Sequence, residues 1–390
     1  SGAGRLHHSL RMPHRRIRRT ARRAASAALL VVPSLAAAQS ADERLQVHGY
    51  ASLGYGVADR TPVIGIPTDG GTSDYRAAAL QVRYALRPQS DVVIQVANRR
   101  FGSSALTADN DVVLDWAFFQ HKFAAGTTVR AGRVPLVRGI YNETRVVGTL
   151  LPFFRAPYNF YTESFTNLDG VAVSHTLDAR GFAVEGTAFG GGFDYNVGVP
   201  NSATGAYDAL RTRGEQALGA QVWLTTPIPG LRLGANAMRF RLNERITTAQ
   251  DARPTATLVL GSLDGTWGRL TVRSEIERQH MRALTYDSWY AQAGLQLHER
   301  LSLWGQTEQT DVDNTFLLAP GRTFDLSYPY ARDHAASANV TLSPNLVLRL
   351  EGHRASGFWF DRVVAPFGAT LAPAPAARTS YGLASLSVSF

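Results

Sequence analysis

Apolar and polar side chains alternate with a period of two through most of the chain from residue 45 onward. At the C-terminus Ala384, Leu386 and Val388 fall on one face, and Ser385 and Ser387 fall on the other. Successive side chains of a β-strand point to opposite faces, so this period predicts strands with one apolar and one polar face. The same alternation recurs in four other segments: 78–84, 270–277, 289–298 and 346–353.

Turn-forming residues separate the predicted strands, and the connections between strands are either short or long. Seven short turns are predicted at 87–90, 124–127, 178–181, 227–230, 264–268, 298–300 and 343–345. Eight longer polar or Gly/Pro-rich loops are predicted at 58–73, 102–110, 137–167, 194–211, 243–253, 281–286, 312–327 and 361–378. This count requires sixteen strands with both termini on the short-turn side. An even strand number and alternating short and long connections are typical of barrels in the bacterial outer membrane.

A soluble all-β protein would also alternate, and two features argue against it. The polar face carries many charges, as in Arg273, Glu275 and Glu277, and charges buried in a soluble core need partners. The chain also ends inside a strand, on the aromatic Phe390. Only a closed barrel satisfies every strand edge in lipid. We therefore predict an all-β fold, a transmembrane antiparallel β-barrel of sixteen strands, over residues 39–390.

The positive charge of the chain is concentrated in its first residues. Eight arginines and no acid lie in residues 1–38, and the remainder holds 32 bases against 31 acids, although the whole chain carries +9. Arg15–Arg23 is followed by the short apolar run Ala24–Val32 and by three alanines that end at Ala38. This order predicts a cleaved signal peptide at 1–38. A membrane anchor would need about 20 apolar residues, and a nucleic-acid-binding arm would not continue into such a run, so no nucleic-acid partner is expected.

Signals for catalysis or bound metal are missing from the sequence. The chain has no cysteine, no Gly-x-Ser-x-Gly, no His-Glu-x-x-His and no phosphate-binding glycine loop. The pairs Asp109/Asp111 and Asp311/Asp313 lack a fuller ligand set for a divalent cation. We expect no enzyme activity, no cofactor and no metal, although a dispersed hydrolase site in a barrel stays an alternative.

Several short motifs resemble a known family. They are the terminal Leu386-x-Val388-x-Phe390, the opening strand Leu45–Tyr55, Leu114–Phe118, Arg130–Val134, Gly139–Glu143 and Leu150–Pro152. Together they resemble Gram-negative outer-membrane porins related to the phosphate-selective porin superfamily, and the specific similarity covers about residues 45–176. The resemblance implies a sixteen-stranded barrel with a water-filled pore, often assembled as a homotrimer. It does not imply a substrate.

Two departures limit what the resemblance implies. Relatives usually have Pro-Phe-Gly before the Tyr-Asn-Glu, where this chain has Val137-Arg138-Gly139. Phosphate-selective members depend on lysine clusters in the pore, and this chain has one lysine, Lys122. Phosphate selectivity is therefore not expected.

A pore selects solutes by its width and by the charges that line it. The alternation places a set of charged residues on the inward face: Arg83, Arg99, Asp115, Arg130, Arg273 and Arg349 belong to it, with Arg232, Glu185, Glu275, Glu277, Glu308 and Glu351. The competing interpretation is that each is an ordinary lumen residue, solvated and paired across strands. Six aromatic residues are candidates for interfacial girdles, with ordinary packing as the alternative: Tyr84, Trp116, Phe118, Phe240, Trp289 and Phe390.

Segment 137–167 is the strongest candidate for a functional loop. It follows the predicted fifth strand, where sixteen-stranded porins commonly fold a constriction loop into the lumen. Charged residues occur in it among many aromatics: Arg138, Glu143, Arg145, Arg155 and Glu163. We expect the loop to narrow the pore, with Glu143 facing wall arginines such as Arg83 and Arg99. A surface loop with no role in the pore is the alternative.

The sequence thus predicts a porin that passes small hydrophilic solutes or ions through the outer membrane, with a weak preference for anions. Its expected partners are outer-membrane lipid, the permeating solutes and two further copies of the chain. A ligand-specific uptake channel and a non-conducting structural or adhesive barrel are the alternatives.

Overall fold

The structure is a computed structural model that describes residues 44–102, 104, 111–179, 181–201, 206–243, 254–282, 284–319, 322–358, 360–361 and 376–390. The predicted signal peptide at 1–38 and Asp109 lie outside these residues. Arg44–Ser389 forms one compact unit. Among the described residues, no helix has the length and hydropathy to cross a membrane.

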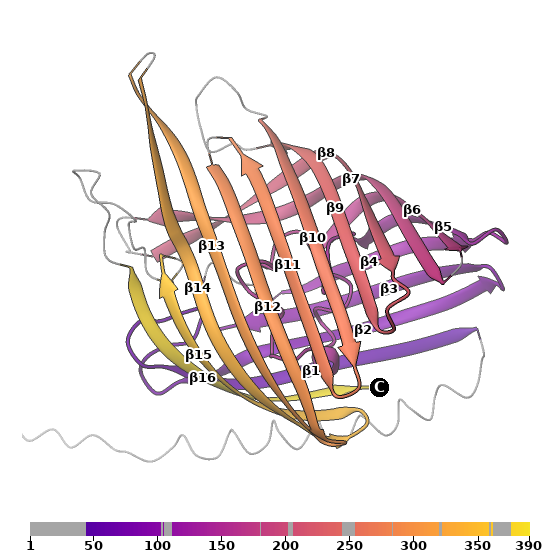
Figure 1. The fold of residues 1–390 in the computed structure, drawn as a ribbon, viewed down its shortest axis with the longest axis horizontal. Coiled ribbons are helices and arrows are strands. Elements are labelled where there is room, and N and C mark those ends of the chain that lie inside the picture. The colour runs from indigo at the N-terminus through magenta and orange to yellow at the C-terminus, as the bar shows by residue number, and fades with distance from the viewer. Residues whose placement is uncertain are drawn as a thin grey trace, which may run out of the picture. The chain divides into compact units, whose positions relative to one another are not determined.

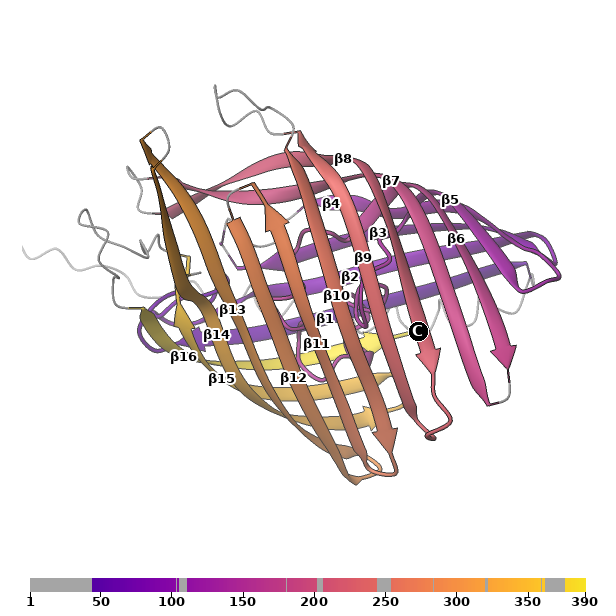
Figure 2. The same ribbon diagram turned by 45° about the horizontal axis from the view of Figure 1, so that its top comes forward.

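The described chain forms sixteen antiparallel strands, each paired with its neighbours in sequence, and β16 pairs with β1 to close the barrel (Figures 1 and 2). The strands are β1 Leu45–Ala58, β2 Thr72–Arg87, β3 Ser90–Phe101, β4 Val112–Lys122, β5 Thr127–Pro135, β6 Asn167–Ala179, β7 Phe182–Asn201, β8 Ala206–Thr225, β9 Leu231–Asn243, β10 Thr255–Trp267, β11 Leu270–Met281, β12 Leu284–His298, β13 Leu301–Ala319, β14 Arg322–Ser343, β15 Leu346–Gly357 and β16 Ala377–Ser389. A short 3-10 helix, η2, spans Gly148–Leu150. The predicted fold class and strand number are confirmed.

Barrel closure follows the predicted alternation. Leu53 of β1 pairs with Leu386 of β16, and both are exposed on the outer face, at 56% and 42%. The neighbouring pair, Ser52 and Ser387, points inward, and the two hydroxyl oxygens are 2.8 Å apart. The terminal serines and leucines therefore lie on opposite faces because the strand pleat separates them.

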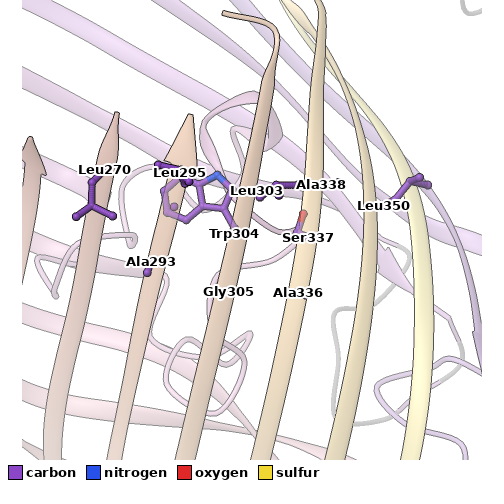
Figure 3. A pocket seen from close by; sticks show the side chains of 11 residues that line it. Leu270, Ala293, Leu295, Leu303, Trp304, Gly305, Ala336, Ser337, Ala338 and Leu350 are labelled. Atoms are coloured by element: carbon purple, nitrogen blue, oxygen red, sulfur yellow. The ribbon is translucent and has the colours of Figure 1, made fainter. Parts of the chain in front are cut away.

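The outer face is largely apolar, as lipid contact requires. Figure 3 shows part of it, a shallow apolar groove of about 570 Å³ across β11 to β15. Leucines and small residues line this groove: Leu270, Leu295, Leu303 and Leu350 with Ala293, Gly305, Ala336 and Ala338.

Near the long-loop end of β9 the polar side chains face outward and the apolar side chains face inward, the reverse of the predicted pattern. Arg239 and Arg241 lie on the outward, exposed face, whereas Phe240 and Leu242 point inward and are each 1% exposed. Of the predicted girdle residues, Tyr84 and Trp289 are exposed, at 39% and 38%.

Three other girdle predictions are wrong, because Trp116, Phe118 and Phe240 pack into the interior apolar cluster. The inward side chains here contact aromatic side chains of the β5–β6 connection, such as Phe165, and not water.

Three predicted long loops are mostly strand or turn. Segments 194–211 and 312–327 continue the hairpins β7–β8 and β13–β14, and these strands of 19 to 22 residues exceed the roughly 10 needed to cross a bilayer. Figure 1 shows β13 and β14 rising past their neighbours. Segment 281–286 is a tight connection, because β11 ends at Met281 and β12 begins at Leu284.

Candidate functional site

Residues 136–166 connect β5 to β6, and we call them the inner loop. They contact side chains that face inward on β1 to β3, β8, β9 and β11 to β16. Figures 1 and 2 both show the inner loop as a coil between the front and back strands. The inner loop therefore lies against inward faces on several sides of the barrel.

Wall side chains accept hydrogen bonds from the loop backbone. Four loop N–H groups donate to them: Gly139 to Gln221 Oε1 at 2.9 Å, Ile140 to Glu275 Oε1 at 3.1 Å, Phe154 to Glu351 Oε1 at 2.7 Å and Asn159 to Glu308 Oε2 at 2.9 Å. Amide groups in an irregular buried segment need such partners, because no neighbouring strand supplies them.

Gly139 makes one of these approaches possible. Its φ of +62° is in the left-handed region, and an added Cβ would overlap the Tyr161 hydroxyl and the Glu275 carboxylate. The altered Val137-Arg138-Gly139 step thus keeps the glycine that the backbone needs.

Arg349 of β15 donates hydrogen bonds to backbone carbonyl oxygens of the loop. Its side chain is fully buried, and its Nη2 donates to the carbonyl oxygens of Gly148 at 2.8 Å and Leu151 at 2.7 Å. Asn339 of β14 accepts from Arg349 Nε at 3.1 Å and donates to the carbonyl oxygen of Pro152 at 3.0 Å. These bonds fix the middle of the inner loop to the wall.

Arg138 anchors the start of the loop. Its Nε and Nη2 donate to Glu277 Oε2 of β11 at 3.0 and 2.6 Å, and Nη2 also donates to the carbonyl oxygen of Phe160. The guanidinium lies 5.0 Å from the Phe160 ring centre and 5.3 Å from that of Tyr161. Arg138 is 4% exposed, and these contacts hold the start of the loop against β11.

Glu163, near the end of the loop, lies close to three guanidinium groups. Its carboxylate lies 3.0 Å from Arg155, 3.5 Å from Arg145 and 3.7 Å from Arg99 of β3. Burial opposes its ionisation, but the guanidiniums outweigh burial and hold the pKa of Glu163 below its usual value. Burial lowers the pKa of Arg145 to about 10, so this arginine is still protonated at neutral pH. Asp115 of β4 lies 3.6 Å from Arg99.

The predicted partners of Glu143 are wrong. Its side chain is 52% exposed, and its carboxylate accepts from Arg130 Nη1 of β5 at 3.1 Å. Arg83 lies near the short-turn end of β2 and binds Asp91 at 2.7 Å, whereas Arg99 is occupied by Glu163. Loop and wall charges do oppose each other, but through different pairs.

A cavity of about 250 Å³, which we call the side cavity, lies between the first half of the inner loop and the wall strands β5 to β9. Charged and aromatic wall residues line it near the short-turn ends of their strands: Arg130, Glu185, Trp223 and Arg232. Arg232 binds Asp264 at 2.7 Å, and Asp264 also accepts from Arg273 Nε at 3.2 Å. Arg273 donates to the Tyr141 hydroxyl of the loop at 3.0 Å.

Several residues that organise this region carry no distinctive signal in the sequence. The turn pattern predicts Asp264 in a connection, whereas Leu258, Leu260, Ser262 and Asp264 share one inward face of β10. Gln221, Asn236 and Asn339 were missed because uncharged amides on a polar strand face carry no distinctive signal.

Acidic side chains also gather on the β13–β15 wall. His353 Nδ1 lies 2.7 Å from Asp333, and its Nε2 lies 3.2 Å from Glu351, which accepts from the loop at Phe154. The imidazole stacks on Tyr381 with ring centres 4.3 Å apart. Within the described chain, no three His, Asp or Glu side chains are placed to hold a metal ion. His353 and the Phe154 N–H of the loop thus contact the two oxygens of the Glu351 carboxylate.

Comparison with solved structures finds outer-membrane barrels. OmpF of Salmonella typhi, in complex with daunomycin, is 11% identical with a TM-score of 0.57, covering 89% of this chain and 97% of that chain. A loop-deletion mutant of Vibrio cholerae OmpT is 12% identical with a TM-score of 0.52, covering 89% and 99%. A trimer form of OmpT is 10% identical with a TM-score of 0.50, with the same coverage. No protein-family model and no curated protein matches this sequence.

At these identities the likeness concerns the fold alone. The chain has a porin-like fold, and its closed barrel and apolar outer face are those of a protein of the outer membrane.

Proposed function

We propose that this chain is an outer-membrane porin that forms a water-filled channel for passive diffusion of small hydrophilic solutes or ions, and that it does not act as an enzyme. One observation carries the proposal. The inner loop is bound by backbone and side-chain contacts to the inward faces of strands on several sides of the barrel. A loop bound in this way narrows the lumen, and the width of a pore decides which solutes pass through it.

The arginines of the lumen support a weak preference for anions. Arg83, Arg99 and Arg130 each have a carboxylate partner, whereas Arg232 and Arg273 share the single carboxylate of Asp264. One positive charge at this site is therefore not neutralised by Asp264. A preference based on one charge in water is small, because solvent and salt screen it.

Recording from planar bilayers tests the proposed function. We expect stepwise conductance from the purified protein, and a larger conductance when the middle of the inner loop, residues 146–158, is replaced by a short glycine–serine linker. Arg349→Met is a second variant for the case in which the shortened protein fails to fold. It removes the donor to two loop carbonyls, so we expect a larger or noisier conductance.

Arg83→Met is the matched control, since among the described residues Arg83 forms an ion pair with Asp91 of the neighbouring strand and with no group of the inner loop. A conductance unchanged in both loop variants would contradict the constriction. Absence of any conductance would favour the alternative of a non-conducting barrel, for which the apolar packing of the inner loop is the supporting observation.

We also propose a homotrimer. The trimer form of OmpT supports it, together with the apolar outward faces of β1 to β3, which include Leu53, Leu80 and Ile94. The unheated protein is expected to migrate as a trimer in a native gel and as a monomer after boiling. Monomer migration before heating, in several mild detergents, would contradict the proposal.

A further inference from the structure

The side cavity is lined by three arginines, two glutamates and one tryptophan. Arg130 and Glu143 pair with each other, and Arg138 pairs with Glu277. The other two charged side chains, Glu185 and Arg232, flank Trp223 on three neighbouring strands. Glu185 of β7 lies directly opposite Trp223 of β8 in the strand register, and the Arg232 guanidinium of β9 lies 4.7 Å from the centre of the Trp223 ring. Neighbouring strands are about 4.8 Å apart, so the charges stand on either side of the indole at roughly two strand spacings.

Glu185 and Arg232 do not neutralise each other. Arg232 binds Asp264 through Nε and Nη2, at 3.1 and 2.7 Å, and this bond draws the guanidinium toward β10. Glu185 is exposed, and it forms no hydrogen bond or ion pair with any other residue that the structure describes. A guanidinium has five N–H donors, and Arg232 uses two of them on Asp264.

The remaining surfaces of the side cavity are suited to a small polar solute. Ser174 and Thr187 contribute hydroxyl groups, and Ile140 and Ala172 contribute apolar surface. Drug-sized ligands occupy pockets of about 300 to 1,000 Å³, so a cavity of about 250 Å³ limits the solute to the size of a single amino acid.

We propose that the side cavity is a binding site for small zwitterionic solutes of the amino-acid type. The ammonium group of the solute binds Glu185, and its carboxylate binds the unused N–H groups of Arg232. This inference rests on the proposed function, because the solute must enter the lumen, and it names the class of solute that the channel retains in passing.

Alanine is the probe, with N-acetylalanine lacking its cation and alaninamide lacking its anion. Binding is measured by calorimetry on the folded protein in detergent and by saturable reduction of the ion current in bilayers. We expect alanine to bind at least about tenfold more tightly than either analogue, because each loses one hydrogen bond between charged groups. Equal binding of alanine and N-acetylalanine would overturn the proposal.

Variants assign the two charges. Glu185→Gln is expected to weaken alanine and alaninamide binding and to leave N-acetylalanine unchanged, whereas Arg232→Gln should do the reverse for the two analogues. Glu299→Gln, in the exposed turn between β12 and β13, is the matched control and should bind alanine as the parent does. Unaltered alanine binding by Glu185→Gln would overturn the assignment.

The two readouts separate this inference from the proposed function. Conductance without saturable alanine binding leaves the porin proposal standing and overturns the zwitterion site. Alanine binding by calorimetry in a protein that never conducts supports the site and contradicts the channel.

Discussion

The buried arginines of the inner loop and of the wall around it are bound by carboxylates and backbone carbonyl groups. Arg145 and Arg155 converge on Glu163, and Arg138 binds Glu277. Removing one member of a buried charge pair leaves the other desolvated and unpaired, which costs about 3 to 5 kcal/mol. The carboxylate of Glu163 is therefore a sensitive point of the loop, since it pairs with Arg145, Arg155 and Arg99. Of these, Arg99 has a second carboxylate partner in Asp115.

The lowered pKa of Glu163 predicts a dependence of stability on pH. A carboxylate whose pKa is lower in the folded protein stabilises the fold above its unfolded pKa, about 4.3, and this contribution is lost as pH falls through the folded pKa. We expect the free energy of unfolding to decrease as the pH falls below about 4. In Glu163→Gln the free energy of unfolding should already be lower at pH 7, by about 3 kcal/mol, and this part of its acid dependence should disappear. Urea titrations between pH 3 and pH 7 measure both effects.

Glu143→Gln is the control for this experiment. Its carboxylate is half exposed and has one arginine partner, so its loss should change the unfolding free energy by less than about 1 kcal/mol. Parallel pH profiles for Glu163→Gln and the parent would contradict the assigned role.

At the level of elements, the inward face of β9 near its long-loop end is apolar and packed, unlike the wall of a water-filled barrel. Phe240 lies 4.9 Å from Phe193 of β7 and 5.9 Å from Phe165 of the inner loop, measured between ring centres. The arginines beside it, Arg239 and Arg241, face outward. Packing between the loop and the wall therefore makes a core inside the barrel at this height, and inward side chains there contribute to stability as core residues do.

Phe240→Ala tests whether this interior is packed. Loss of a buried phenylalanine from a core costs about 3 to 5 kcal/mol, whereas the same change at a wall facing water would cost little. We expect the large value, measured by urea unfolding in detergent micelles. Leu233→Ala, at an exposed outward position of the same strand, is the matched control and should cost less. Equal losses in the two variants would show that the interior near Phe240 is not packed.

The strand pattern was accessible from the sequence because each strand reports its own two faces through a period of two. That local signal, with the spacing of the turns, predicted sixteen strands, the inward face of the arginines and a long connection after the fifth strand. The expectation that this connection enters the lumen came from the resemblance to porins. The partners of those arginines were not accessible. Arg138 and Glu277 are 139 residues apart, and the path of an irregular loop across a barrel decides that they meet. The inward orientation of Phe240 could not be predicted either. A short apolar–polar alternation does not say which face of the strand lies inside the barrel.

For the whole molecule, the relevant charge is the local balance in the lumen. Asp264 faces two arginines, Arg232 and Arg273, and its loss would leave both uncompensated at this site. The pair is partly exposed, so the effect on a passing ion is that of a unit charge in water, about 1 kcal/mol at 4 Å and less with salt. We therefore expect Asp264→Asn to increase the chloride-to-potassium permeability ratio by roughly two- to fivefold. The reversal potential in a potassium chloride gradient measures this ratio.

The outer face provides the control for that experiment. Asp287 binds Arg278 at 2.7 Å, and Arg278 lies on the exposed, outward side of β11. Asp287→Asn removes the same charge from the protein, but the barrel wall separates it from the ion path, so we expect no shift in reversal potential. A shift of equal size in the two variants would mean that selectivity follows the net charge of the protein. A shift toward potassium in Asp264→Asn would contradict the assignment of Arg232 and Arg273 to the ion path, because removal of a lumenal carboxylate can only make that path more positive.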